Sequence, residues 1–256
     1  MSLAIISLSD AGACVARKVS AKTEADVFLH DSVSSTVGSR RFLRLADLVN
    51  EIFFNYHGLI FIAPCGAVVR VIAPHLQHKT IDPAVVVVDV GGRYAVSLLS
   101  GHEGGANQLA VDVANILGAE PIVTTTSDAV KNLVVGVGCR RGASAQSIER
   151  AIRAALDEAD LSLSEVRFIA SADIKADEKG LRDTAAALGV PLRLIPSDEI
   201  RACQREFSLS DVAQRNVNLK AVAEPAALLA GRRTRFVLSR KIWESVTVAI
   251  AREEFE

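Results

Sequence analysis

The chain has 256 residues, which is enough for one large domain or two small ones, and we predict two. Half of the residues are hydrophobic and the formal net charge is −1, so no overall charge attracts nucleic acid or an anionic membrane surface. No segment approaches the roughly 20 consecutive apolar residues that a membrane span needs.

The first half of the chain alternates β-rich runs with helical patterns, which is typical of βαβ units around a mainly parallel sheet. The pair Gly91-Gly92 between two β-rich runs predicts a hairpin, and Asp89 either caps this hairpin or has a buried polar role. Gly118 is the stop signal of a helix that begins at about Gly105. We expect strands at 3–8, 25–30, 58–63, 84–90, 94–99 and 121–126, and helices at 12–21, 45–56 and 105–117.

The polar segment from Ser127 to Asn132 is the predicted domain boundary and divides the chain into residues 1–130 and 131–256. Ser144 is a good N-cap for a helix that extends to about Ala159. The predicted fold class is therefore α/β, with two small domains and mostly parallel or mixed sheets. We expect the strands of the second half at 133–138, 166–170, 191–195, 235–238 and 246–250.

The densest cluster of chemically active residues is the segment from Ser100 to Asn107, which reads Ser-Gly-His-Glu-Gly-Gly-Ala-Asn. It lies at a predicted strand-to-helix junction, where backbone N–H groups and the positive end of a helix bind anionic groups. Glycines let a ligand approach the backbone closely, and histidine is suited to proton transfer near neutral pH. This segment is our leading candidate site; the alternative is a tight glycine turn with His102 as a solvated loop residue.

A second cluster, from Pro64 to Arg70, also follows a predicted strand. We expect it to bring Arg70 and the Gly66 amide to the same edge of the sheet as the first cluster, although Arg70 is equally well interpreted as a surface charge. We interpret Cys65 as a packed thiol in preference to a nucleophile, because a nucleophile needs a neighbouring base to lower its pKa. The chain has no C-x-x-C motif, so its four cysteines are expected to be free thiols in a reducing cytoplasm.

Two smaller groups of candidate residues lie in the second half. The segment from Gly136 to Gly142 departs from the G-x-G-x-x-G spacing of dinucleotide sites, so we expect no NAD or FAD and interpret it as a phosphate- or carboxylate-binding turn. Glu224 lies at a predicted helix start, where it either complements the helix dipole or belongs to a site. His75 and His78 have no third ligand nearby, so no protein-bound metal is expected.

Together these segments resemble the cobalt-precorrin-5A hydrolases, the CbiG proteins. The string Leu-Leu-Ser-Gly-His-x-Gly-Gly-Ala-Asn at 98–107 is specific, and the second half alone also resembles CobE, a protein of the same pathway. Members of the family carry a middle region between their two parts, whereas here Asp128 is followed almost at once by the strand at Leu133. The resemblance runs through 64–74, 79–89, 98–107, 121–128, 135–142, Lys175, Glu178, Gly180, 222–230 and 246–252.

The resemblance implies a cytoplasmic enzyme of the anaerobic, early-cobalt-insertion route to cobalamin (vitamin B12). Its substrate is a cobalt-containing tetrapyrrole, cobalt-precorrin-5A, whose δ-lactone is opened with release of acetaldehyde to give cobalt-precorrin-5B. No cofactor is implied, because the cobalt belongs to the substrate. The implied protein partners are a second copy of the chain, in a homodimer, or other enzymes of the pathway.

Lactone opening requires an activated water and donors for an oxyanion. On this resemblance we assign His102 as the general base and Glu103 as its orienting residue or as a second acid/base, with backbone amides around Gly104 and Gly105 as oxyanion donors. Arg70, Arg140 and Lys175 are expected to pair with the acetate and propionate arms of the macrocycle. The full expected substrate-binding set is Gly66, Arg70, Ser100, Gly101, Gly104, Gly105, Asn107, Gly138, Arg140, Lys175 and Glu224.

Two other functions stay open at this point. One is a non-catalytic corrinoid-binding protein that holds or channels a labile intermediate of the same pathway. The other is an α/β enzyme that acts on a different small anionic substrate.

Overall fold

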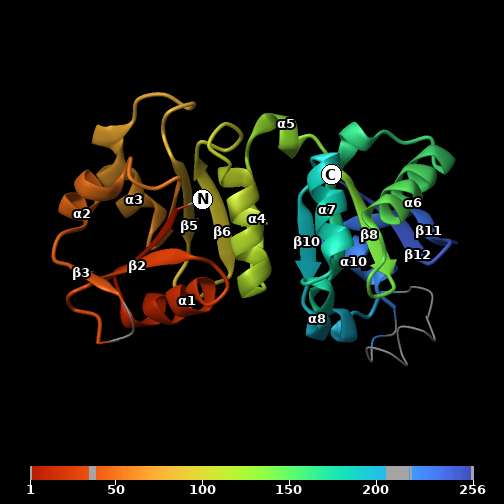
Figure 1. Cartoon of the computed structure of the whole chain (residues 1–256), viewed down its shortest axis with the longest axis horizontal. Helices are drawn as coiled ribbons and strands as arrows, with labels where there is room; N and C mark the ends of the chain where they lie inside the picture. Colours follow the sequence, from red (N-terminus) through yellow and green to blue (C-terminus); the bar gives the residue numbers. More distant parts are fainter. Residues whose placement is uncertain (1, 35–38, 206–218, 220, 255–256) are drawn as a thin grey trace. The chain divides into compact units, whose positions relative to one another are not determined.

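The computed structural model describes residues 2–34, 39–205, 219 and 221–254. The chain folds into two compact units, Met1–Thr125 and Thr126–Glu256, each built on its own sheet (Figure 1). Both units are α/β, as the alternation of β-rich runs and helical patterns predicts. None of the described helices is long and apolar enough to cross a membrane.

The first unit contains a seven-stranded sheet with the order β3-β2-β1-β4-β5-β6-β7. Strands β1 to β5 are parallel, β6 runs antiparallel to β5, and β7 is parallel to β6. Every residue of β4 and β5 is buried, which is expected of central strands that are covered on both faces. The strands are β1 Leu3–Ser7, β2 Ala25–His30, β3 Arg40–Phe42, β4 Gly58–Ile62, β5 Ala84–Val88, β6 Tyr94–Leu99 and β7 Glu120–Ile122.

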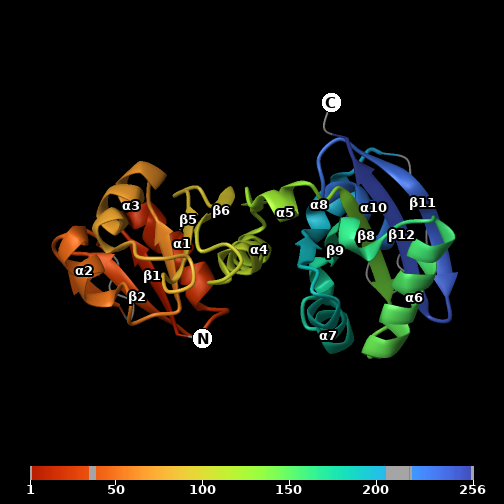
Figure 2. The ribbon, with the colours of Figure 1, turned by 90° about the horizontal axis from the view of Figure 1, so that it is seen from above.

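Helices cover both faces of this sheet (Figure 2). Helices α1 (Asp10–Ser20) and α4 (Ala106–Leu117) pack on one face, while α2 (Leu45–Ile52) and α3 (Cys65–Ile72) pack on the other, where η1 (Ala73–His75) continues α3. Neighbouring residues of a strand point to opposite faces, so Ile5 joins the core under α1 and Ile6 joins the core under α2 and α3.

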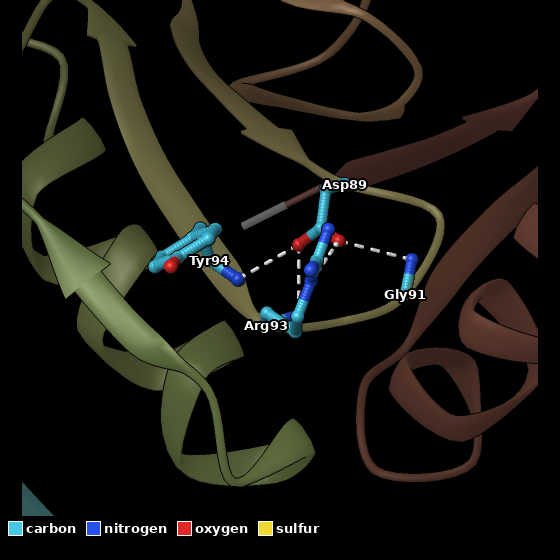
Figure 3. A network of polar contacts seen from close by, with 4 residues as sticks. All are labelled: Asp89, Gly91, Arg93 and Tyr94. Carbon is cyan, nitrogen blue, oxygen red and sulfur yellow. Dashed lines mark hydrogen bonds and ion pairs between the residues drawn. The ribbon is translucent and has the colours of Figure 1, made fainter.

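The predicted hairpin between β5 and β6 is confirmed, and Asp89 caps its turn (Figure 3). The Asp89 carboxylate accepts hydrogen bonds from the backbone N–H groups of Gly91, Arg93 and Tyr94 at 3.0, 2.7 and 2.8 Å, and from Nε of Arg93 at 3.2 Å. Partial burial raises the pKa of Asp89, but these hydrogen bonds outweigh burial and hold the pKa below its ordinary value. The hairpin reverses the chain, so β6 ends where β5 begins.

The second unit contains a five-stranded sheet with the order β10-β9-β8-β12-β11. Strands β8 (Leu133–Cys139), β9 (Val166–Ala172) and β10 (Leu192–Ile195) are parallel, and the hairpin of β11 (Thr234–Trp243) and β12 (Val246–Glu253) adds two strands in which β12 is antiparallel to β8. The remaining elements are α5 Thr126–Ala129, α6 Ala145–Glu158, η2 Leu163–Glu165, η3 Asp173–Lys175, α7 Lys179–Leu188, α8 Ser197–Ala202 and α10 Ala223–Leu229.

The two faces of the second sheet carry different helices. Helices α6 and α7 pack on the face that contains Val135 and Val248, and α10 packs on the opposite face against Ala249 and Ala251. Ser144 caps α6 as predicted, because its side chain accepts a hydrogen bond from the Ser147 amide. Helix α10 crosses β8 so closely that a Cβ added at Gly136 would lie 1.9 Å from the Ala223 carbonyl oxygen.

Several elements differ from the sequence prediction. The strand expected at 121–126 ends at Ile122, and the residues from Thr126 form the short helix α5. The strand expected at 235–238 extends from Thr234 to Trp243 because it pairs along most of β12. The elements β3, α3 and α7 were not predicted, since they are short or have no clear start signal.

Candidate active site

The segment from Ser100 to Gly105 forms the loop between β6 and α4, as predicted. Backbone N–H groups in and just after this loop donate hydrogen bonds to carbonyls of the same loop. The N–H groups of Gly104 and Ala106 both donate to the Ser100 carbonyl at 3.1 Å, and Gly105 N–H donates to the His102 carbonyl at 3.2 Å. A backbone N–H has one proton to donate, so in this conformation the Gly104 and Gly105 amides are used within the loop, and their role as oxyanion donors stays a prediction.

The loop glycines are needed for close packing. A Cβ added at Gly101 would lie 2.7 Å from Oδ1 of Asn107, and one at Gly104 would lie 2.5 Å from Cβ of Ser100. Gly105 has a φ of 84°, a left-handed conformation that favours glycine at this N-cap position. These three positions therefore fix the shape of the loop, and their contact with substrate stays a prediction.

Asn107, in the first turn of α4, joins this region to β6 and to the segment that follows β7. Its side chain is buried, and its Oδ1 accepts a hydrogen bond from Oγ of Ser97 at 2.8 Å. Its Nδ2 donates to Oγ1 of Thr125 at 3.0 Å. Sequence reasoning missed both partners; Ser97, a polar residue inside an apolar strand, was the available signal.

The two predicted catalytic residues lie on the exposed side of the loop. His102 and Glu103 are both exposed, and a carboxylate oxygen of Glu103 lies 2.6 Å from Nζ of Lys79. The hydrogen bond from Lys79 lowers the pKa of the Glu103 carboxyl, so this group is a carboxylate at neutral pH. Lys79 was not predicted as a site residue; it lies near Glu103 because β6 ends beside the start of β5.

Gly66 and Arg70 do not lie at the same edge as this loop. Both are on α3, which follows the carboxyl end of β4, and Nη1 of Arg70 donates to the Gly66 carbonyl at 2.9 Å. Leu99 pairs with Val85 near the start of β5, so the Ser100 loop lies at the amino ends of β4 and β5. The expectation of a shared edge is wrong because β6 is antiparallel.

An apolar cavity of about 330 Å³ lies at the carboxyl ends of β4 and β5. Cys65 lines it and is exposed, so the interpretation of this residue as a packed thiol is wrong. None of the described residues that line the cavity is a histidine or lysine. The carboxylate among them, Asp89, already accepts hydrogen bonds within the hairpin turn. The cavity therefore gives the Cys65 thiol no free base.

In the second unit, several candidate residues gather at the carboxyl end of β8. Gly138 and the exposed Arg140 flank Cys139. Burial raises the pKa of the Cys139 thiol and the nearby Lys175 ammonium lowers it, but the effect of burial is larger and the pKa is raised overall. Lys175 is mostly buried, and its Nζ lies 3.6 Å from a carboxylate oxygen of Glu178. The other carboxylate oxygen of Glu178 accepts from the Gly142 amide at 2.7 Å, which ties the glycine turn to the start of α7.

The side chain of Glu224, on α10, forms a hydrogen bond with β11. It is buried in the first turn of α10, and its Oε1 accepts a hydrogen bond from the Arg240 amide on β11 at 2.9 Å. The structure thus gives Glu224 a role in holding an irregular strand. Its contact with substrate stays a prediction.

The fold and the loop define a two-unit α/β protein with an exposed histidine at a strand-to-helix junction. Among the described residues, no three His, Cys, Asp or Glu side chains gather to hold a metal ion. The chain belongs to the cobalamin synthesis G family: the N-terminal family model matches residues 47–128 and the C-terminal family model matches residues 133–251. Only residues 129–132 separate the two matches, so no middle region lies between them.

The proteins of known name to which this chain is similar support membership of the same family. The chain is 27% identical over 302 aligned positions to a cobalt-precorrin-5A hydrolase of Priestia megaterium, with 80% of each chain covered. It is 38% identical over 127 residues to the cobalt-precorrin-5A hydrolase of Salmonella typhimurium, which covers 50% of this chain and 36% of that protein. Protein CobE of a Sinorhizobium species is 28% identical over 128 residues, which covers 49% of this chain and 83% of CobE.

Proposed function

We propose that this protein is a cobalt-precorrin-5A hydrolase of cobalamin biosynthesis. It opens the δ-lactone of the cobalt tetrapyrrole and releases acetaldehyde, to give cobalt-precorrin-5B. The relatives named above and the two family-model matches support this function. The structural observation that carries it is the Ser100–Asn107 loop, which lies within the N-terminal match and presents His102 beside an anchored carboxylate.

In this proposal His102 is the general base that removes a proton from the attacking water. Glu103 is ionised, because Lys79 lowers the pKa of its carboxyl, so it stabilises positive charge on His102 and does not act as a general acid at neutral pH. Lys79 in turn fixes where the Glu103 carboxylate lies.

The carboxylate arms of the macrocycle require cationic partners. Lys175 suits this role because its ammonium is mostly buried and makes a long contact, 3.6 Å, with Glu178, while Arg140 is exposed just after β8. Arg70 lies at the other edge of the first sheet from the Ser100 loop, so we leave it out of these contacts. The protein itself uses no cofactor in this proposal, since the cobalt enters as part of the substrate.

We also place the protein in the cytoplasm, in keeping with its free cysteines, where its partner is a second copy of the chain or another enzyme of the pathway. Light scattering of the purified chain, alone and mixed with the enzyme that makes its substrate, distinguishes these two partners.

The test is acetaldehyde release from cobalt-precorrin-5A by the purified chain alone. We expect turnover by the natural chain and a loss of about 10²–10⁴-fold in His102→Ala, because a positioned general base contributes that much to the rate. His30→Ala is the matched control, since His30 lies on β2 and its ring contacts Ser32 and the Leu43 carbonyl. It should keep the turnover of the natural chain.

A fully active His102→Ala protein would remove the role of His102. Tight binding of the tetrapyrrole by the natural chain without any acetaldehyde would instead identify a corrinoid-binding protein. No perturbation by tetrapyrroles at all would favour an enzyme with a different anionic substrate.

A further inference from the structure

Ser100 has a backbone conformation that serine rarely adopts. Its φ is 56°, in the left-handed region that favours glycine. Among the described residues, three other non-glycine residues have positive φ, namely Asp160, Arg233 and Glu244, and all three are exposed. Ser100 is instead buried, at 7% exposure, so surrounding contacts hold it in this conformation.

The hydroxyl of Ser100 has no hydrogen-bond partner. Within the described part of the chain, its Oγ is the buried side-chain polar atom that lacks one. The Ser100 carbonyl, in contrast, accepts two amides of its own loop, and a Cβ on Gly104 would collide with the Ser100 side chain. A buried hydroxyl without a partner and a left-handed serine both cost stability, so folding alone does not account for this residue.

The Ser100 hydroxyl lies in a loop in which the backbone N–H groups already donate hydrogen bonds to carbonyls of the loop. The N–H groups from Gly104 to Asn107 donate to carbonyls of Ser100, Gly101 and His102, so none of them is left for a developing oxyanion. The Ser100 hydroxyl has a proton to donate and is two residues from His102.

We infer that the Ser100 hydroxyl is the hydrogen-bond donor to the acyl oxygen of the substrate. This role rests on the proposed function. It supplies the oxyanion contact as water adds to the lactone carbonyl, and no covalent bond to serine forms. Substrate must displace the groups that shield Oγ, since this hydroxyl is buried in the present conformation.

The test compares thermal stability with turnover in Ser100→Ala. Removing a hydroxyl that has no partner should leave Tm unchanged or raise it. If the hydroxyl contacts the oxyanion, kcat should fall about 10²-fold with little change in KM, because the contact is made mainly in the transition state. Ser100→Gly, which also relieves the left-handed strain, should lose the same turnover at equal or higher Tm.

Ser171→Ala is the matched control. The Ser171 hydroxyl is also buried but donates to the Val137 carbonyl at 2.8 Å, so its removal should lower Tm and leave kcat unchanged. Full turnover in Ser100→Ala, or a loss of turnover that only follows a loss of Tm, would overturn the role of Ser100. A natural chain that releases no acetaldehyde would contradict the proposed function itself, and with it this role.

Discussion

Asp89 and Ser100 lie at opposite ends of the same stretch of chain, and their side chains differ in hydrogen bonding. The Asp89 carboxylate accepts four hydrogen bonds in the turn that leads into β6. The Ser100 hydroxyl, at the end of β6, has none. The first residue stabilises the reversal of the chain, and the second leaves a buried polar group without a partner where the reversed strand ends.

Asp89→Asn should weaken the β5–β6 hairpin by about 1–2 kcal/mol at neutral pH, because an amide cannot accept from all four donors. The pKa of Asp89 is lowered in the folded state, so its stabilisation is complete above the ordinary pKa of an aspartate. It is lost as the pH falls through the lowered folded-state pKa. Amide hydrogen exchange across residues 84–99 should therefore differ between the variant and the natural chain at pH 7 and converge in acid; an equal difference at both pH values would contradict this.

At the scale of elements, the direction of β6 decides where the candidate site lies. A parallel β6 would have delivered the Ser100 loop to the carboxyl ends of the strands, near Arg70. The hairpin delivers it to the amino ends, beside Lys79, which precedes β5. The carboxyl ends of β4 and β5 are left with an apolar cavity and Cys65.

The packing of α10 on β8 gives a second prediction at this scale. Gly136→Ala should destabilise the second unit by roughly 2–4 kcal/mol, because the added Cβ would overlap the Ala223 carbonyl and the backbone must move. Gly138→Ala is the matched control, since its Cβ would meet its nearest neighbour at 3.5 Å, an ordinary contact. Urea unfolding followed by the fluorescence of Trp243 measures both; equal stabilities would contradict the close crossing.

For the whole molecule, the described hydrophobic cores are separate. Each of the five core clusters known for the described residues lies entirely within Met1–Thr125 or entirely within Thr126–Glu256. Each unit therefore buries enough apolar surface to have a core of its own, and the chemistry of each half is positioned by its own sheet.

A substitution in one core should thus destabilise one unit. Ile60→Ala and Ile152→Ala each empty a fully buried position, in the first and second unit respectively, and each should cost about 2–5 kcal/mol. Hydrogen exchange should show lost protection in the substituted unit and unchanged protection in the other. Lost protection in both units after either substitution would contradict the separation.

The sequence by itself determined the local features. Apolar runs predicted most strands, Gly91-Gly92 predicted the hairpin, Gly118 ended α4, and Ser144 capped α6, because these signals depend on residues within a few positions of one another. The family also followed from local strings, above all the one at 98–107. The separation of Arg70 from the Ser100 loop was not predicted, nor was the exposure of Cys65.

Only the tertiary structure decided which groups meet. The Lys79–Glu103 pair, the burial of Glu224 against Arg240 and the unpartnered Ser100 hydroxyl depend on strand order and direction. The Gly91-Gly92 turn predicted the direction of β6 relative to β5, but hydrophobic periodicity does not encode which strands are neighbours or which side chains meet across them.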